Sequence, residues 1–415
     1  MYKDLEHPAI GVWPLQNAPF KMSETPAYNS ETGSLIGQHN KEIFEGLLGI
    51  SHEEFVNGFQ DGTFWPKDYD RSSYPYLQEM IDDASTAEWT GNDPSPSTPP
   101  TPIRSINSKP EGAFTGLRVL EVADKKGQWC GKLMGDMGAD VIKIEPPDGA
   151  TARSVGPFYQ DIPDREKSLY FWHYNTSKRS ITLNLETEDG KRIFKQLSGS
   201  ADVIIETFKP GYMKSLGLDY ETLKKDNPGL IMCSITDFGQ SGPWKDYLSS
   251  DLLHLAAGGQ MAGCGYSEDE YPDAPPIAGG GGQAWHMGSH FGYIAIGSAL
   301  MHRSVTGKGQ YLDVSIHECC ALTTEMHVNT WIYEKHDFDF GDQVITVDGG
   351  VPPQTDFTPP ELISFKLESD EVSAGKRLCK SLCHGRCCFG KRFKISQRSP
   401  HGGPGRHPAR KVIRR

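Results

Sequence analysis

From Gly116 onward, short apolar runs rich in β-branched residues alternate with amphipathic segments of helical length. Repeated βα units of this kind are typical of a parallel, doubly wound sheet with right-handed crossovers. We therefore predict an α/β fold whose ligand lies at the carboxyl ends of the strands. The expected strands are residues 117–123, 139–145, 180–185, 201–208, 230–236 and 311–316, and the expected helices are residues 189–199, 220–228, 283–303 and 318–334.

The turn after the first expected strand reads ADKKGQWCGKLMGDMG and lacks the Gly-x-Gly-x-x-Gly pattern of dinucleotide-binding sheets. The sequence also contains no Gly-x-x-x-x-Gly-Lys-Ser/Thr phosphate loop and no Gly-x-Ser-x-Gly nucleophile turn. The segment HECCA at His317 lacks the second histidine of a zinc-protease helix. The absence of these patterns argues against a dinucleotide dehydrogenase, a P-loop enzyme and a serine hydrolase.

Basic side chains gather near several of the expected strand ends. Lys125 and Lys126 follow the first strand, Lys178 and Arg179 precede the third, and Lys209 follows the fourth. Several converging cations at a ligand-binding edge favour a phosphate-bearing, water-soluble ligand. For each lysine taken alone, a solvated surface turn is the competing interpretation.

A run of four glycines, residues 279–282, stands directly before the long expected helix. Glycines let a ligand approach the backbone amides closely, yet no carboxylate, serine or cysteine follows at once to carry out chemistry. His286 and His290 would share one face of that helix, as two metal ligands do. No acidic or thiol third ligand lies nearby in sequence, so a packing role is favoured for both histidines.

The cysteines have similarly plain interpretations. Cys319 and Cys320 lie in an apolar helical segment, where small core residues are favoured over nucleophiles. Four cysteines near the carboxyl end could bind zinc with His384, but their spacing differs from paired Cys-x-x-Cys motifs, and disorder is favoured there. These four are Cys379, Cys383, Cys387 and Cys388. We predict no metal site.

Charge is distributed very unevenly along the chain. Residues 372–415 contain 13 of the 42 Lys and Arg and none of the 54 Asp and Glu, so the remainder carries a net charge of 29 − 54 = −25. Such a tail could bind nucleic acid or an acidic partner in a salt-dependent way, which is the alternative function. Apolar runs shorter than the roughly 18 residues of a membrane span, and a start without a signal pattern, predict a cytoplasmic protein with no membrane partner. The tail has no recognisable nucleic-acid-binding module, so a nucleic-acid partner is not favoured.

Four long segments resemble the family III CoA-transferases, which include formyl-CoA transferase, carnitine CoA-transferase and alpha-methylacyl-CoA racemase. These segments are GLRVLEVADKKGQWCGKLMGDMGADVIKIEPPDG, SLYFWHYNTSKRSITLNLETEDGK, ADVIIETFKPGYMKSLGLDYETLKKDNPGLIMCSITDFGQSGP and ALMHRSVTGKGQYLDVSI. The resemblance implies a Rossmann-like sheet in two interlocked subunits, here a homodimer if the chain is complete. It also implies transfer of CoA between carboxylic acids through an acyl anhydride on an aspartate, with CoA as substrate and no cofactor.

The resemblance further implies which residues contact CoA or an acyl-CoA thioester. In the family these contacts come from the loops after successive strands, which here hold Lys125, Lys126, Leu183, Asn184, Thr207, Phe208 and Lys209. The family's nucleophilic aspartate falls about twenty residues before the turn at Thr306, where this sequence has Ala284 or Trp285. Asp251 is the nearest acid by pattern, and either a catalytic role or an ordinary helix N-cap would explain it. The racemase pattern has a histidine where Ser250 stands. The chain is therefore expected to bind CoA with little or no catalysis.

The amino-terminal region is similar to the segment that normally closes this family's chains. Ile43, Leu47 and Leu48 follow a helical period, and Ser51 with Glu54 forms a capping box, so a helical pair is expected. We interpret the chain as part of a tandem protein with two repeats. The expected divisions are residues 1–90, the mostly helical end of a preceding repeat; 91–113, a Pro/Ser linker; 114–344, the CoA-transferase Rossmann-like domain; and 345–415, a disordered basic tail.

Overall fold

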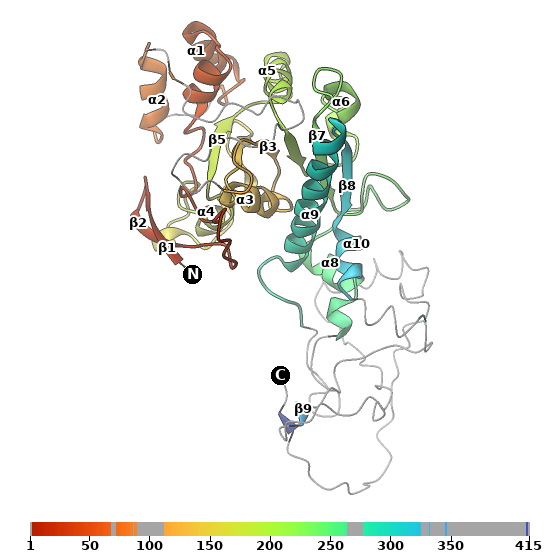
Figure 1. Ribbon diagram of the computed structural model, residues 1–415. Coiled ribbons are helices and arrows are strands. Elements are labelled where there is room, and N and C mark those ends of the chain that lie inside the picture. Colours follow the sequence, from red (N-terminus) through yellow and green to blue (C-terminus); the bar gives the residue numbers. More distant parts are fainter. Residues whose placement is uncertain are drawn as a thin grey trace, which may run out of the picture. The chain divides into compact units, whose positions relative to one another are not determined.

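The computed structural model describes residues 2–67, 72–85, 87–88, 112–263, 277–324 and 332, with two short paired strands, β9 (Ile345–Thr346) and β10 (Val412–Ile413) (Figure 1). The chain divides into two compact units. The first comprises Met1–Asp246 and Trp285–Ser315, and the second comprises Tyr247–Ala284 and Ile316–Arg415. Most of the predicted linker and most of the predicted basic tail lie outside the described residues.

The first unit is built on a six-stranded parallel sheet, as the alternating pattern predicts. The strands follow the order β5-β4-β3-β6-β7-β8, so the chain winds outward in one direction and then returns to the centre to wind in the other. Ligands bind such sheets where the strand order reverses, which here is between β3 and β6. The strands are β3 (Arg118–Val122), β4 (Asp140–Glu145), β5 (Lys178–Thr182), β6 (Val203–Glu206), β7 (Ile231–Thr236) and β8 (Tyr311–Ser315).

Every residue of β3, β6 and β7 is buried, which explains why these strands read as nearly continuous apolar runs. Helices connect the strands, and α9 packs closely on the sheet because Gly292 has no side chain: a Cβ there would lie 2.8 Å from Ile235 Cδ1 of β7. The connecting helices are α3 (Gln128–Asp136), α4 (Leu169–Tyr174), α5 (Glu188–Gly199), α6 (Tyr212–Ser215), α7 (Tyr220–Leu223) and α9 (Gln283–Thr306), with 3-10 turns at Thr151–Ser154 and Tyr159–Asp161.

A buried ion network joins the first three strands of the sheet. The two carboxylate oxygens of Glu121 on β3 lie 2.8 Å from Lys143 Nζ on β4 and 2.7 Å from Lys178 Nζ on β5. Lys178 begins β5 and is 2% exposed, so the prediction that Lys178 and Arg179 converge on the ligand edge is wrong. Arg179 instead pairs with Glu42 and Asp140. The apolar run placed the expected strand at residues 180–185, whereas β5 begins two residues before this range, at Lys178.

The described part of the amino-terminal segment, residues 2–67 and 72–85, contacts the outer edge of β5 through His39 and Asn40. Main-chain and side-chain bonds link Ser180 to His39, and Asn40 bonds Thr182 twice, at 2.8 and 2.9 Å. This contact covers backbone groups that an edge strand would otherwise expose. The segment contains an antiparallel hairpin that the sequence analysis did not anticipate, β1 (Tyr2–His7) with β2 (Gly11–Gln16), then a π-helix at Glu42–Leu47, α1 (His52–Asp61) and α2 (Pro75–Asp82).

The capping signal at the start of α1 corresponds to a real cap. Ser51 precedes the helix, and its hydroxyl accepts a hydrogen bond from the Glu54 N–H at 3.2 Å. Gly62 ends the helix with a φ of +93°, a left-handed conformation in which glycine is favoured. A cluster of buried aromatic rings packs at this helix, and it comprises Phe44, Phe55 and Phe64.

The described part of the second unit contains α8 (Asp251–Ala257), a 3-10 turn at Gln260–Gly263 and α10 (Ile316–Leu322). These helices approach closely at Gly258, where a Cβ would lie 2.6 Å from Cys320 Cβ. Cys319 and Cys320 are buried in α10, and burial raises the pKa of each thiol to about 12, as expected for core residues. Among the helices described in either unit, none is long and apolar enough to cross a membrane.

Candidate functional site

A cavity of about 490 Å³ opens at the carboxyl ends of β3, β4, β5 and β6, beside the point where the strand order reverses. Its walls come from the loops that follow these four strands. The described lining residues are Val122, Ala123, Asp124, Ile144, Glu145, Pro146, Pro147, Ala150, Thr151, Leu183, Asn184, Leu185, Glu186, Thr207, Phe208 and Tyr212. We call this the main cavity.

The loops after β3 and β6 are tied to each other across the reversal. The Thr207 hydroxyl accepts a hydrogen bond from the Asp124 N–H at 2.8 Å and donates one to the Asp124 carboxylate at 3.0 Å. Gly127 allows this approach, since a Cβ there would lie 2.7 Å from Thr207 Cγ2. These short contacts hold the two loops against each other at the cavity wall.

Four residues that the sequence analysis selected, Leu183, Asn184, Thr207 and Phe208, line the main cavity together. The lysines of the same prediction do not belong to its described lining. Lys126 Nζ lies 3.5 Å from the Asp237 carboxylate, and Lys125 Nζ lies 5.9 Å from the ring centre of Trp285. Lys209 is exposed, one residue beyond Phe208. The three lysines therefore lie within two residues of a lining residue in the sequence. None of them is among the described residues that line the cavity.

Glu206 is a buried carboxylate beside the main cavity that the sequence analysis missed. It ends β6, is 3% exposed, and accepts a hydrogen bond from the Phe208 N–H at 2.7 Å. Ser234 on β7 bonds the same carboxylate and receives a 2.8 Å hydrogen bond from the Tyr311 hydroxyl on β8. Burial raises the pKa of Glu206 to about 7. An acid within the apolar run ADVIIETF was the available signal.

Glu145, at the end of β4, is a buried acid that lines the main cavity. Its carboxylate accepts bonds from Arg153 at 2.7 and 2.8 Å and from the Ser180 hydroxyl at 2.6 Å. Burial opposes its ionisation, but Arg153, Lys143 and Ser180 together hold the pKa of Glu145 at about 2. Glu145 is therefore an ionised structural residue whose charge is matched by the guanidinium.

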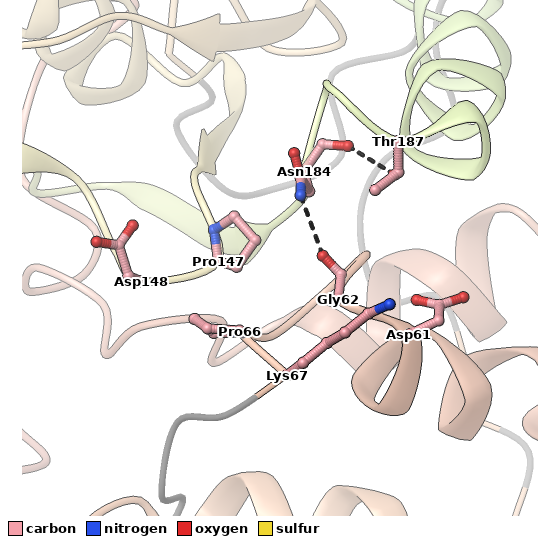
Figure 2. A pocket seen from close by; sticks show the side chains of 8 residues that line it. All are labelled: Asp61, Gly62, Pro66, Lys67, Pro147, Asp148, Asn184 and Thr187. Carbon is pink, nitrogen blue, oxygen red and sulfur yellow. Dashed lines mark hydrogen bonds between the residues drawn. The ribbon is translucent and has the colours of Figure 1, made fainter.

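A second cavity of about 430 Å³ adjoins the main cavity and shares Pro147 and Asn184 with it. We call it the adjoining cavity; the amino-terminal segment and the loops after β4 and β5 form its walls (Figure 2). Asn184 connects the two sides, because its side-chain amide donates to the Gly62 carbonyl at 3.2 Å (Figure 2). Its backbone N–H also donates to Thr63 O at 2.8 Å. The described lining residues are Asp61, Gly62, Pro66, Lys67, Pro147, Asp148, Asn184 and Thr187.

In the second unit, the Asp251 carboxylate accepts a hydrogen bond from the Ala284 N–H at 2.7 Å. The N-cap of α8 is Ser250, whose hydroxyl accepts from the Leu253 N–H, so the predicted N-cap role of Asp251 on its own helix is wrong. Asp251 instead stabilises the first turn of α9, where the backbone amides of a helix have no internal partner. Ala284 is fully buried.

The glycine run before α9 contains two successive left-handed residues, Gly281 at φ +85° and Gly282 at φ +75°. These angles disfavour any residue with a Cβ, which explains two of the four glycines by backbone conformation. Gly279 and Gly280 have φ values outside the left-handed region. The prediction that the run lets a ligand approach the backbone remains a prediction for these two positions.

His286 and His290 belong to an aromatic cluster in the first unit. The Trp129 ring stacks with the rings of His173 and His286, with ring centres 5.9 and 5.1 Å away, and the Tyr174 hydroxyl bonds His286 Nε2 at 2.7 Å. Burial lowers the pKa of His173 to about 4 and lowers that of His286 as well. The described residues contain no group of three or more His, Cys, Asp or Glu arranged to hold a metal ion. The half-buried His286 packs against Trp129 and bonds Tyr174, whereas the exposed His290 bonds Trp129 and the His286 carbonyl.

A sequence model described as CoA-transferase family III matches residues 114–347, which is more than half of the 415-residue chain. The chain belongs to CoA-transferase family III. It is 40% identical over 214 residues to acetyl-CoA:oxalate CoA-transferase of Acetobacter aceti, covering 51% of this chain and 52% of that protein. It is 35% identical over 221 residues to succinyl-CoA:(R)-benzylsuccinate CoA-transferase subunit BbsE of Thauera aromatica, covering 53% of each.

Among solved structures, this CoA-transferase family member is similar to a CAIB/BAIF family protein from Brucella suis, with a TM-score of 0.51 and 36% sequence identity. The match covers 55% of this chain and 59% of that chain. The predicted family and α/β fold class are thereby confirmed. The chain spans about half the length of the curated relatives it matches.

Proposed function

We propose that this chain binds CoA or an acyl-CoA thioester in the main cavity, as part of a protein that moves CoA between carboxylic acids. The observation that carries the proposal is the meeting of Leu183, Asn184, Thr207 and Phe208 in one cavity at the strand ends. Relatives are named for the exchange of CoA between acetate and oxalate and between succinate and glutarate. Apolar lining residues such as Ile144, Leu185 and Phe208 suit the thiol arm of CoA.

The chemistry of such a transfer requires a carboxylate nucleophile. One carboxylate oxygen bonds to the acyl carbon, the carbon–sulfur bond breaks, and CoA leaves as a thiolate while an anhydride remains on the protein. The position implied by family resemblance holds Ala284 or Trp285, neither of which can act in this way. We therefore propose that this chain binds CoA with little catalysis by a residue at that position.

Asp251 is the candidate for any remaining activity. Its carboxylate lies 2.7 Å from the Ala284 nitrogen, beside the position where the family resemblance implies a nucleophile. A second subunit or repeat that brings its own aspartate is the other proposed source. By the same resemblance we propose that residues 1–90 close a preceding repeat, that 91–113 link it to the domain of 114–344, and that complete chains form homodimers in the cytoplasm.

Calorimetric titration with CoA tests the binding proposal. We expect a saturable heat with the whole chain, and an affinity several-fold weaker in Lys209→Ala, because an exposed cation beside Phe208 would be lost. Lys224→Ala is the control, since Lys224 is paired with Glu221 on α7. An absence of CoA binding, or an equal loss in both variants, would reject this assignment. The alternative of a nucleic-acid or acidic-partner binder depends on residues 372–415, which lie outside the described residues except for β10, and no observation favours it.

A further inference from the structure

Two buried acids end the strands that flank β3, and their surroundings differ. Glu145 ends β4 and Glu206 ends β6. The Arg153 guanidinium bonds Glu145 at 2.7 and 2.8 Å and keeps it ionised. Glu206 is bonded by the Phe208 N–H and the Ser234 hydroxyl, neither of which carries a charge. Acids whose surroundings differ in this way titrate in different pH ranges and take different roles.

The hydrogen bonds at Glu206 have a definite direction. The Tyr311 hydroxyl on β8 donates to Ser234 Oγ at 2.8 Å, so the Ser234 proton is available for the Glu206 carboxylate. The Phe208 N–H donates to Glu206 Oε2 at 2.7 Å. These two donors favour the ionised carboxylate, whereas burial of the residue, which is 3% exposed, opposes it. The result is a raised pKa of about 7, so both charge states are populated near neutral pH.

The charged groups that face Glu206 from neighbouring elements act on it in opposite directions. Lys126, in the loop after β3, favours the charged form, but its Nζ also lies 3.5 Å from the Asp237 carboxylate. Asp313 on β8 favours the neutral form. Tyr311 stays uncharged, because burial raises its pKa to about 12. Glu206 therefore has no counter-ion of its own among these groups, and an anion placed nearby would shift it toward the neutral form.

Glu206 adjoins the wall of the main cavity. Thr207 and Phe208, the next two residues, line that cavity, and the Thr207 hydroxyl bonds Asp124 at the wall. CoA is an anion, and its sulfur becomes a thiolate each time an acyl group leaves it. A negative charge buried beside the wall opposes such a ligand, because water and salt screen buried charges much less than exposed ones.

We propose that CoA binding is coupled to a proton on Glu206: the chain binds CoA together with a proton taken from solvent at this carboxylate, and loss of that proton weakens binding. This inference rests on the proposed function. Glu206 then sets the charge beside the ligand, and Ser234 sets the pH at which that charge develops. Such coupling is reciprocal, so CoA should bind less tightly as pH rises and should take up protons as it binds.

Calorimetric titration of the whole chain with CoA, in buffers of different ionisation enthalpy from roughly pH 5.5 to 8.5, measures affinity and proton uptake together. We expect the affinity of the unmodified chain to fall about fivefold relative to Glu206→Gln across this range, with about 0.4 proton taken up near pH 7. Glu206→Gln keeps the size of the side chain and an oxygen acceptor but cannot ionise. The phosphates and the thiol of CoA titrate in both proteins, so their contribution cancels in the comparison.

Ser234→Ala gives a second readout. It removes a hydrogen bond that favours the charged form of Glu206, so the midpoint of the affinity change should move to higher pH while the affinity on the acid side stays the same. Glu221→Gln is the matched control, because Glu221 is exposed on α7, where it pairs with Lys224 at 2.6 Å. This control should reproduce the curve of the unmodified chain.

The outcomes distinguish failure of this inference from failure of the proposed function. Parallel affinity curves, or equal proton uptake, for the unmodified chain and Glu206→Gln would overturn the coupling while CoA binding itself stood. A loss of affinity by the same factor at every pH would overturn it as well, because Glu206 would then support the fold alone. An unmoved midpoint in Ser234→Ala would contradict the role of Ser234. Absence of CoA binding at every pH would reject the proposed function and this inference with it.

Discussion

The carboxylate of Asp251 accepts a hydrogen bond from the backbone N–H of Ala284 at 2.7 Å. One residue is the acid that the sequence pattern selects, and the other occupies the position at which family resemblance implies a nucleophile. The bond stabilises the first turn of α9 and keeps a carboxylate beside that position. Asp251 is therefore a candidate for two roles, a structural role through this hydrogen bond and a catalytic role as a nucleophile. A substitution that preserves the hydrogen bond distinguishes the two roles.

Asp251→Asn retains an oxygen acceptor for the Ala284 N–H but removes the ionised carboxylate. If Asp251 is a nucleophile, hydroxylamine should trap an acyl hydroxamate from the unmodified chain incubated with acetyl-CoA or succinyl-CoA, and the Asn variant should give none. If its role is structural, both proteins should give the same background signal and unfold at nearly the same denaturant concentration. Asp251→Ala should be less stable by about 1 kcal/mol in either case, as for a lost helix cap.

The ionisation of Glu206 should make stability depend on pH. Burial raises its folded pKa from 4.5 to about 7, although Ser234, Phe208 and Lys126 partly oppose the shift. The folded chain then holds a proton that the unfolded chain has released, so this stability is present below pH 4.5 and is lost as pH rises through about 7. The loss is on the order of 3 kcal/mol. Denaturant unfolding from pH 4.5 to 8 should show Glu206→Gln gaining relative to the unmodified chain, whereas parallel curves would contradict the assignment.

The sequence predicted the fold more fully than the site because the two depend on different information. Burial of both faces of the sheet leaves an apolar signal along each strand, so β3, β4, β6 and β7 were found nearly at their true ends. Where a side chain points depends on packing between distant segments. Lys125 and Lys126 follow β3 as expected, yet they lie against Trp285 and Asp237, which no spacing near residue 125 could indicate.

The position of Lys178 demonstrates the same difference. A lysine next to an apolar run reads as a solvated strand end, but its charge is matched inside the sheet by Glu121. The adjoining cavity likewise depends on residues 61–67 meeting the loops after β4 and β5, which lie eighty or more residues later in the chain. Only the three-dimensional pairing of Asn184 with Gly62 and Thr63 reveals it.

Removing the Glu121 carboxylate should be among the most destabilising single changes in the sheet. Glu121→Gln leaves Lys143 and Lys178 buried without their shared anion, and breaking a buried ion network in this way costs roughly 3–5 kcal/mol. The denaturation midpoint should fall accordingly. Glu188→Gln is the control, because Glu188 pairs with Lys191 on the exposed surface of α5, and its midpoint should not change measurably. Equal midpoints for the two variants would refute a stabilising role for the network.

Two substitutions in the glycine run before α9 distinguish a role in backbone conformation from a role in ligand binding. Gly281→Ala places a Cβ at φ +85°, which should destabilise the chain by about 1–2 kcal/mol. Gly280 is outside the left-handed region and an added Cβ there would meet no atom within 4 Å, so Gly280→Ala should leave the denaturation midpoint unchanged. If the run also brings CoA close to the backbone, Gly280→Ala should weaken CoA binding in calorimetry while stability is retained. Unchanged affinity in Gly280→Ala would instead indicate that the run serves to form the turn into α9. The left-handed conformations of Gly281 and Gly282 would then be the remaining reason for glycines in the run.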